Sequence, residues 1–71
     1  MAWNMEVDAE KPKRLRQEKV LSQRELARLS GLTQATVWRL ENGFHRVHPK
    51  TIRKLAKALE VEPLELVKKE E

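Results

Sequence analysis

The apolar residues between positions 23 and 42 follow two short helical patterns that are separated by a glycine. In the first pattern, over residues 23–30, Leu26 and Leu29 recur at helical spacing with the small Ala27 between them. A small residue lets two helices cross closely, because a bulky side chain at the crossing point would push them apart. This pattern predicts a short helix that packs against a neighbouring helix through Ala27.

Gly31 ends the first pattern, as expected where a helix terminates in the left-handed conformation, which costs least for a residue without a Cβ atom. Thr33 follows, and its hydroxyl can accept a hydrogen bond from a backbone N–H at the start of a second helix, over residues 34–41. Val37 and Leu40, three residues apart, would face the core from that helix. Two short helices joined by a tight turn form a helix-turn-helix.

The sequence before this unit predicts another helix, over residues 10–19. Pro12 fits only in its first turn, where backbone N–H groups lack helical partners. Leu15 is its clearest core residue, and we expect Val20 and Leu21 to pack after it. Ser22, with a glutamate three residues later, forms a capping-box pattern at the start of the helix over residues 23–30.

The sequence after this unit predicts two more helices. Residues 49–60 carry an amphipathic stripe at positions i, i+3, i+4 and i+7, which we interpret as core: Ile52, Leu55, Ala56 and Leu59. Pro63 suits the first turn of a last short helix over residues 63–68, with Leu66 and Val67 facing inward.

Two stretches, LRQEKVLSQRELARLSGLTQATVWRLENG and TIRKLAKALEVEPLELV, resemble the lambda repressor/Cro-like helix-turn-helix family. The resemblance implies an all-α fold, a compact bundle of about five short helices, whose third helix enters the DNA major groove. The DNA-binding domain would cover residues 11–68, with the helix-turn-helix at 23–42. Residues 1–10 would be a flexible or docked segment, and residues 69–71 a frayed tail.

The resemblance also implies roles for individual residues. Arg16 would pair with Glu41 and tie the first helix to the end of the third. Gln23 would contact a phosphate and steady the first glutamine of the third helix, and the turn at Asn42 and Gly43 would also touch the phosphate strand. Ala27, Gly31, Val37 and Leu40 would have structural roles.

The outer face of the helix over residues 34–41 is where a base sequence would be read. Gln34 can bridge N6 and N7 of adenine, Arg39 can bridge O6 and N7 of guanine, and Ala35 can meet a thymine methyl group. Trp38 allows three interpretations: contact with DNA, packing in a dimer interface, or folding back on its own domain. Thr33 and Thr36 are expected to contact phosphate or cap the helix rather than read bases.

The segment after this helix offers further phosphate contacts. Arg46 is the clearest, and Lys50 lies at the start of the next helix. His45 and His48 are three residues apart, but no third ligand is near in the sequence, so we expect no metal site. Two aromatic residues, Phe44 and Trp3, are expected to pack rather than to bind.

Composition supports a nucleic-acid partner. The net charge of the 71-residue chain is +4, but residues 11–57 hold thirteen Lys and Arg against three Glu, while both ends are acidic. Positive charge concentrated on the helix-turn-helix suits a polyanion. The chain has no cysteine, no apolar run that would span a membrane, and no signal-peptide pattern. We therefore expect a soluble, cytoplasmic protein.

These features predict sequence-specific binding of double-stranded DNA by a transcriptional regulator. We expect no enzymatic activity, because no catalytic constellation is visible in the sequence. No cofactor or small-molecule ligand is expected. Because one such module contacts few base pairs, we expect a homodimer on a palindromic operator. The alternative is a protein-interaction module of the same fold, either antitoxin-like or regulator-binding. RNA binding lacks the aromatic residues that stack on single-stranded bases.

Overall fold

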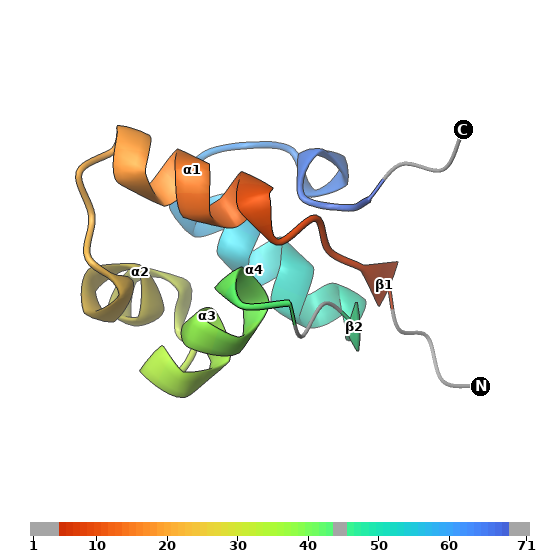
Figure 1. Cartoon of the computed structure of the whole chain (residues 1–71), viewed down its shortest axis with the longest axis horizontal. Coiled ribbons are helices and arrows are strands. Elements are labelled where there is room, and N and C mark those ends of the chain that lie inside the picture. The colour runs from red at the N-terminus through yellow and green to blue at the C-terminus, as the bar shows by residue number, and fades with distance from the viewer. Residues whose placement is uncertain (1–4, 44–45, 69–71) are drawn as a thin grey trace.

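The computed structural model describes residues 5–43 and 46–68, so the expectations for Trp3, Phe44, His45 and the tail at 69–71 lie outside the described residues. Within these ranges, four α-helices and one 3-10 turn follow the predicted order: α1 (Glu10–Glu18), α2 (Gln23–Ser30), α3 (Gln34–Glu41), α4 (Pro49–Leu59) and η1 (Pro63–Glu65). Two short strands, β1 (Met5–Glu6) and β2 (Arg46–Val47), complete the fold (Figure 1). The predicted all-α class is confirmed, with one α-helix fewer than expected.

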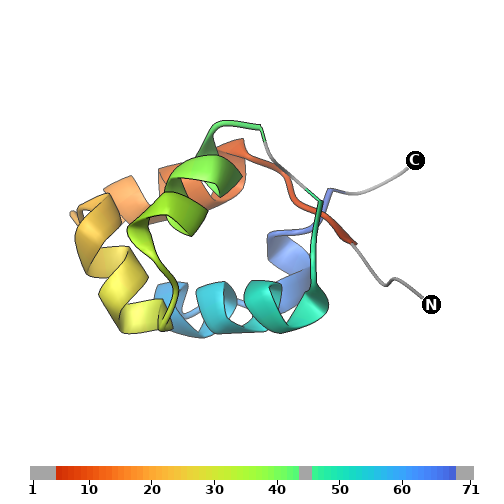
Figure 2. The ribbon, with the colours of Figure 1, turned by 90° about the horizontal axis from the view of Figure 1, so that it is seen from below.

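The core lies between α4 on one side and the pair α1 and α3 on the other, with α2 closing one end (Figure 2). The predicted stripe of α4 is buried throughout, and the remaining buried apolar residues come from α2, α3 and the segments that follow β1 and η1. The buried apolar residues are Val7, Leu26, Ala27, Val37, Leu40, Ile52, Leu55, Ala56, Leu59 and Leu66. Complete burial of a leucine or isoleucine side chain contributes about 1.5–3 kcal/mol.

The ends of α2 follow the local signals in the sequence. The backbone N–H of Glu25 donates to Ser22 Oγ at 3.0 Å, and the N–H of Ser22 donates to Glu25 Oε1 at 2.9 Å, which completes the capping box. Gly31 ends the helix in the left-handed conformation at φ +74°. The backbone N–H and the hydroxyl of Ser22 lower the pKa of Glu25. The cap therefore stabilises the fold above the pKa of Glu25 in the unfolded chain, and this contribution is lost as pH falls through the lowered pKa.

Two apolar residues near the helix-turn-helix, Val20 and Leu29, are exposed. Val20 has 87% of its surface exposed and adopts φ +56°, because the backbone leaves α1 through a left-handed residue there. Its side chain therefore points away from the core, and the expectation that Val20 packs after Leu15 is wrong. Leu29 is 58% exposed, since the core-facing side of α2 is formed by Leu26 and Ala27.

Replacing Val20 with glycine is expected to stabilise the domain by about 1 kcal/mol. A left-handed conformation costs a residue with a Cβ atom roughly 1–2 kcal/mol, and the greater freedom of glycine in the unfolded chain offsets part of the gain. Because the valine side chain is exposed, its removal takes no packing contacts from the core. Thermal unfolding should show a midpoint higher by about 4–8 °C. Val20→Ala, which keeps Cβ, should change the midpoint less; an equal rise in both variants would show that backbone strain is not the cause.

The last element ends earlier than predicted. Instead of a helix to residue 68, η1 stops at Glu65, because the following backbone pairs with the N-terminal segment. Leu66 O accepts from the N–H of Asp8 at 2.9 Å, and the N–H of Lys68 donates to Glu6 O at 2.8 Å. Leu66 faces inward and is fully buried, whereas Val67 is partly exposed.

Candidate nucleic-acid interface

A buried carboxylate fixes α3 against the two helices before it. Arg16 Nε donates to Glu41 Oε2 at 2.7 Å, and the Arg16 Nη2 group donates to Glu41 Oε1 at 3.0 Å. Arg16 also donates to the backbone oxygen of Leu21 at 2.7 Å. The Arg16–Glu41 pair that the family resemblance implies is thus formed, with a side-chain exposure of 12% for Arg16 and 1% for Glu41.

Gln23 adds a third donor to this carboxylate. Its Nε2 group donates to Glu41 Oε1 at 3.0 Å, so the carboxylate of α3 holds side chains from both α1 and α2. The hydrogen bond from Arg16 to Glu41 raises the pKa of the guanidinium. Desolvation offsets much of the attraction in such a pair, so its main effect is to fix orientation. The sequence contains no local signal for the link between Gln23 and Glu41, which lie 18 residues apart.

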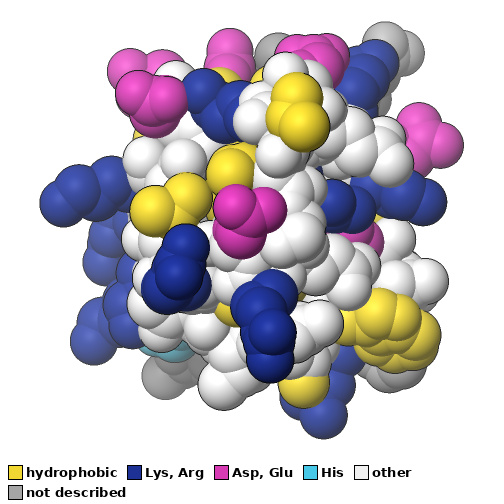
Figure 3. All heavy atoms as spheres, turned by 90° about the vertical axis from the view of Figure 1, so that its left-hand side faces the viewer, with side chains coloured by type: hydrophobic (Ala, Val, Ile, Leu, Met, Phe, Trp, Pro, Cys, Tyr) yellow, Lys and Arg dark blue, Asp and Glu magenta, His cyan; other side chains and the backbone are white. Residues whose placement is uncertain are grey.

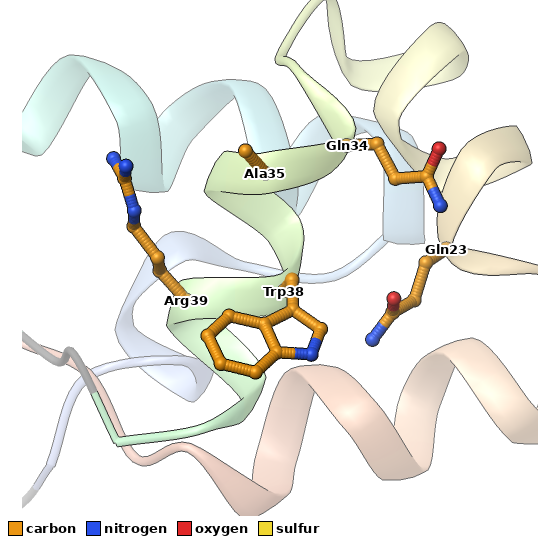
Figure 4. Close-up of a pocket in the computed structure, with 5 residues that line it drawn as sticks. All are labelled: Gln23, Gln34, Ala35, Trp38 and Arg39. Atoms are coloured by element: carbon orange, nitrogen blue, oxygen red, sulfur yellow. The ribbon is translucent and has the colours of Figure 1, made fainter.

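The exposed face of α3 brings together the four residues predicted to read bases. Gln34, Ala35, Trp38 and Arg39 line one open hollow of ≈ 550 Å³ together with Gln23. Gln34 and Arg39 project to opposite sides of the helix, with Ala35 and Trp38 between them (Figure 4). Val37 and Leu40 lie on the other face and are 1% exposed, as predicted. The helix therefore presents a polar and aromatic face while its apolar face holds it to the core.

Trp38 keeps 50% of its surface exposed in this hollow. Its indole extends across the front of α3 in Figure 4 rather than into the core. Folding back on its own domain is therefore not what the structure shows. Contact with DNA and packing in a dimer interface are the two interpretations that fit this exposure.

The polar residues at the ends of α3 are engaged with the helix. Thr33 Oγ1 accepts from the backbone N–H of Thr36 at 3.1 Å and lies 2.8 Å from Thr36 Oγ1. At the other end, Asn42 Nδ2 donates to Trp38 O at 2.7 Å. The amide nitrogen of Asn42 carries two hydrogens and uses one of them in this bond. The hydroxyls of Thr33 and Thr36 carry two hydrogens between them and use one in their mutual bond. Each end of α3 therefore keeps a donor for a phosphate.

The cationic phosphate candidates lie on separate elements from the hollow. Arg46 lies in β2 and Lys50 in the first turn of α4, and both are exposed. In the described ranges, no carboxylate lies within ion-pair distance of Arg39, Arg46 or Lys50. His48 caps α4, accepting from the backbone N–H of Lys50 at Nδ1 over 3.1 Å. Sequence reasoning missed this cap, for which the position of His48 directly before Pro49 was the available signal.

Charge is distributed unevenly over the surface. Figure 3 shows the end of the molecule formed by α2 and the α1–α2 connection. Lys and Arg side chains spread over its lower part and edges, and acidic side chains gather mainly along its upper edge. The lower part of this view is the side on which α3 lies in Figure 1. Positive potential thus accompanies the helix that carries the open hollow.

Comparison with known proteins decides the family. The family model HTH_3, described as helix-turn-helix, matches residues 13–66. The chain belongs to the HTH_3 helix-turn-helix family. This membership confirms the resemblance found in the sequence, and it makes the chain a DNA-binding protein of a family of transcription regulators. No curated protein sequence matches the chain.

Two solved structures of regulatory proteins are similar to the HTH_3 chain. The restriction-modification controller protein C.AhdI from Aeromonas hydrophila has 44% sequence identity and a TM-score of 0.76; the match covers 80% of this chain and 86% of that protein. An HTH_3 family transcriptional regulator from Vibrio cholerae has 30% identity and a TM-score of 0.74, over 80% of this chain and 32% of that chain. The controller protein thus matches over nearly its whole length.

A hydroxyethylphosphonate dioxygenase contains a similar segment. Its Y98F mutant matches 94% of this chain with a TM-score of 0.80 and 27% identity, but the match covers only 14% of the enzyme. The likeness therefore concerns a small part of the enzyme, and HTH_3 regulators are typically not enzymes. Across residues 5–43 and 46–68, no group of three or more metal-binding side chains occurs, and none of the helices has the length and apolar character to cross a membrane.

Proposed function

We propose that this HTH_3 chain binds a specific double-stranded DNA sequence as a transcriptional regulator and inserts α3 into the major groove. The observation that carries the proposal is the exposed face of α3, where Gln34, Ala35, Trp38 and Arg39 line one hollow. The Glu41 network fixes this helix against α1 and α2. A helix held in one orientation can present its side chains to base edges without ordering them at each binding event. The similarity to a restriction-modification controller protein supports a regulatory role.

Each residue of this face has a chemistry that suits a base edge. Gln34 would bridge N6 and N7 of an adenine, and Arg39 would bridge O6 and N7 of a guanine. Ala35 and the exposed indole of Trp38 would contact thymine methyl groups. Because Gln34 and Arg39 project to opposite sides of α3, they would read base pairs that are separated along the groove.

The phosphate contacts would surround this face. The donors that remain on Gln23, Thr33, Thr36 and Asn42 belong to the ends of α2 and α3, while Arg46 and Lys50 supply charge from the neighbouring elements. Such contacts set the register and most of the affinity, whereas the base contacts set the sequence. The two phosphate backbones that border the major groove would therefore be held on either side of α3.

The proposed operator is palindromic and bound by a dimer, because half-sites one helical turn apart match the two-fold symmetry of a dimer. Leu64 in η1 is a leucine with 70% of its surface exposed, and it would supply an apolar contact for a second copy. Val67 is less suited, since its backbone pairs with Val7 of its own chain.

Replacing Leu64 with serine is expected to reduce the coupling between two half-sites. Removing the apolar contact should weaken binding to a full palindrome by about 5–150-fold, the range of typical coupling energies of 1–3 kcal/mol, and leave binding to a single half-site unchanged. Leu29→Ser is the matched control, because Leu29 is an exposed leucine on α2. Equal weakening on the single half-site would show that Leu64 does not act through dimerisation.

The salt dependence of binding separates DNA recognition from a protein-interaction module. Binding through several phosphates should weaken steeply with salt, with a slope of about 0.9 log unit per log unit of salt for each phosphate neutralised. Fluorescence anisotropy with a labelled duplex at several salt concentrations measures this slope. A chain that binds no duplex at low salt would contradict the proposal and favour the protein-interaction alternative.

A further inference from the structure

The N-terminal segment is paired with the strand that carries Arg46. β1 runs antiparallel to β2, with Met5 opposite Val47 and Glu6 opposite Arg46. The two strands lie at the end of the molecule where both termini emerge (Figure 1). A segment about 40 residues earlier in the chain therefore holds the backbone of the main cationic phosphate candidate.

The same segment is also tied to the C-terminal part of the chain. Val7 forms a bridge with Val67, the N–H of Asp8 donates to Leu66 O at 2.9 Å, and the N–H of Lys68 donates to Glu6 O at 2.8 Å. The Glu6 carboxylate lies 3.3 Å from Lys68 Nζ. Residues 5–8 thus lie between β2 and residues 66–68, and each neighbour contributes backbone pairing.

Burial of Val7 anchors this arrangement. Its side chain is 2% exposed and belongs to the same apolar core as Leu66 and α4. The alternation of residues in a strand lets Val7 face the core while Glu6 faces outward. The segment is therefore fixed by the core, and it transmits that constraint to β2 through the ladder.

The side chain of Arg46 is exposed and has no ion-pair partner in the part of the chain that the structure describes. Packing around the guanidinium therefore does not determine where it lies. Backbone pairing with β1 restricts the position of its Cα atom and of the first side-chain bonds. Ordering a free loop residue on DNA costs backbone entropy, and pairing before binding removes much of this cost.

We propose that residues 5–8, here called the N-terminal brace, position Arg46 for its contact with a DNA phosphate. This inference rests on the proposed function and adds a positioning role for a segment outside the helix-turn-helix. Val7 acts through Arg46 and does not itself touch DNA. Loosening the brace is therefore equivalent to losing the phosphate contact of Arg46, without removing its charge.

The test is a double-mutant cycle of DNA affinity measured against salt. Val7→Ala should weaken binding several-fold, and its salt slope should fall by up to about 0.9, as for Arg46→Ala. In the Arg46→Ala background, Val7→Ala should have no further effect, because the contact it supports is already absent. Val61→Ala is the matched control: it removes the same atoms from a residue packed on the same core but outside the pairings of the brace. It should leave the slope unchanged.

Several outcomes would overturn the inference. An unchanged salt slope in Val7→Ala, or effects of Val7→Ala and Arg46→Ala that add, would show that the brace supports stability alone. If Val7→Ala does not fold at the assay temperature, Val7→Thr keeps the side-chain shape and leaves no cavity, while its buried hydroxyl still weakens the core contact, and the same comparison applies. If the unmutated chain binds DNA and the Val7 variants bind with the same affinity and salt slope, only the positioning role of the N-terminal brace is refuted. A parent chain that binds no duplex refutes the proposed function itself.

Discussion

Replacing Glu41 with alanine is expected to destabilise the domain by about 3–5 kcal/mol. The change leaves the partly buried guanidinium of Arg16, whose side chain is 12% exposed, without its carboxylate, and it removes the acceptor of Gln23 as well. A chain of 71 residues has a free energy of unfolding on the order of 4–11 kcal/mol, so the variant would lose a large part of it. Denaturant unfolding followed by far-ultraviolet circular dichroism measures the difference.

Two controls separate the effect of a buried charge from that of any lost ion pair. Lys19 and Glu60 also form a pair at 2.7 Å, but Glu60 has 77% of its side chain exposed, so Glu60→Ala should change stability little. The double variant Arg16→Met with Glu41→Leu replaces the pair with apolar side chains of similar size. It should be much more stable than Glu41→Ala, since no charge is left unpaired. A loss in the double variant as large as in Glu41→Ala would contradict this explanation.

Replacing Arg39 with alanine is expected to reduce affinity for the cognate site by about 1–3 kcal/mol, or roughly 5–150-fold. Arg39 lies on the outer face of α3, at the edge of the hollow opposite Gln34, and its guanidinium has no ion-pair partner among the described residues. Loss of a two-point contact with guanine should also make all four base pairs nearly equivalent at that position. Competition binding with duplexes substituted at each position measures both effects.

Arg46→Ala is the matched comparison, because it removes the same side chain from the proposed phosphate-binding strand. It should weaken binding to selected and random duplexes alike and lower the salt slope by about 0.9. If both variants instead reduced binding to selected and random DNA equally, the division into base-reading and phosphate-binding residues would be wrong.

Local signals account for most of the fold. Ser22, Gly31 and Thr33 act within a few residues of their own positions, and the structure uses each of them as the sequence predicts. The buried stripe of α4 could also be predicted from the sequence, because a period of 3.6 residues places its members on one face of the helix whatever they pack against. The exposed face of α3 follows from the same period, since Val37 and Leu40 determine which side is buried.

The features that were missed depend on residues distant in the sequence. No local pattern reports that β1 pairs with β2 about 40 residues later, or that Gln23 donates to Glu41. Val20 was misjudged because apolar character alone does not show that the backbone turns left-handed at that point. Contacts with DNA depend on a partner molecule, so the roles of Gln34, Trp38 and Arg39 are proposals that only binding measurements test.

Selection of binding sites from a randomised duplex pool at moderate salt tests the central claim most directly. The account predicts enrichment of a palindrome, with half-sites about one helical turn apart, by the parent chain. The Arg39→Ala variant should enrich the same palindrome with one position relaxed in each half. Enrichment of no sequence, with only salt-sensitive binding to the bulk pool, would contradict sequence-specific recognition by α3.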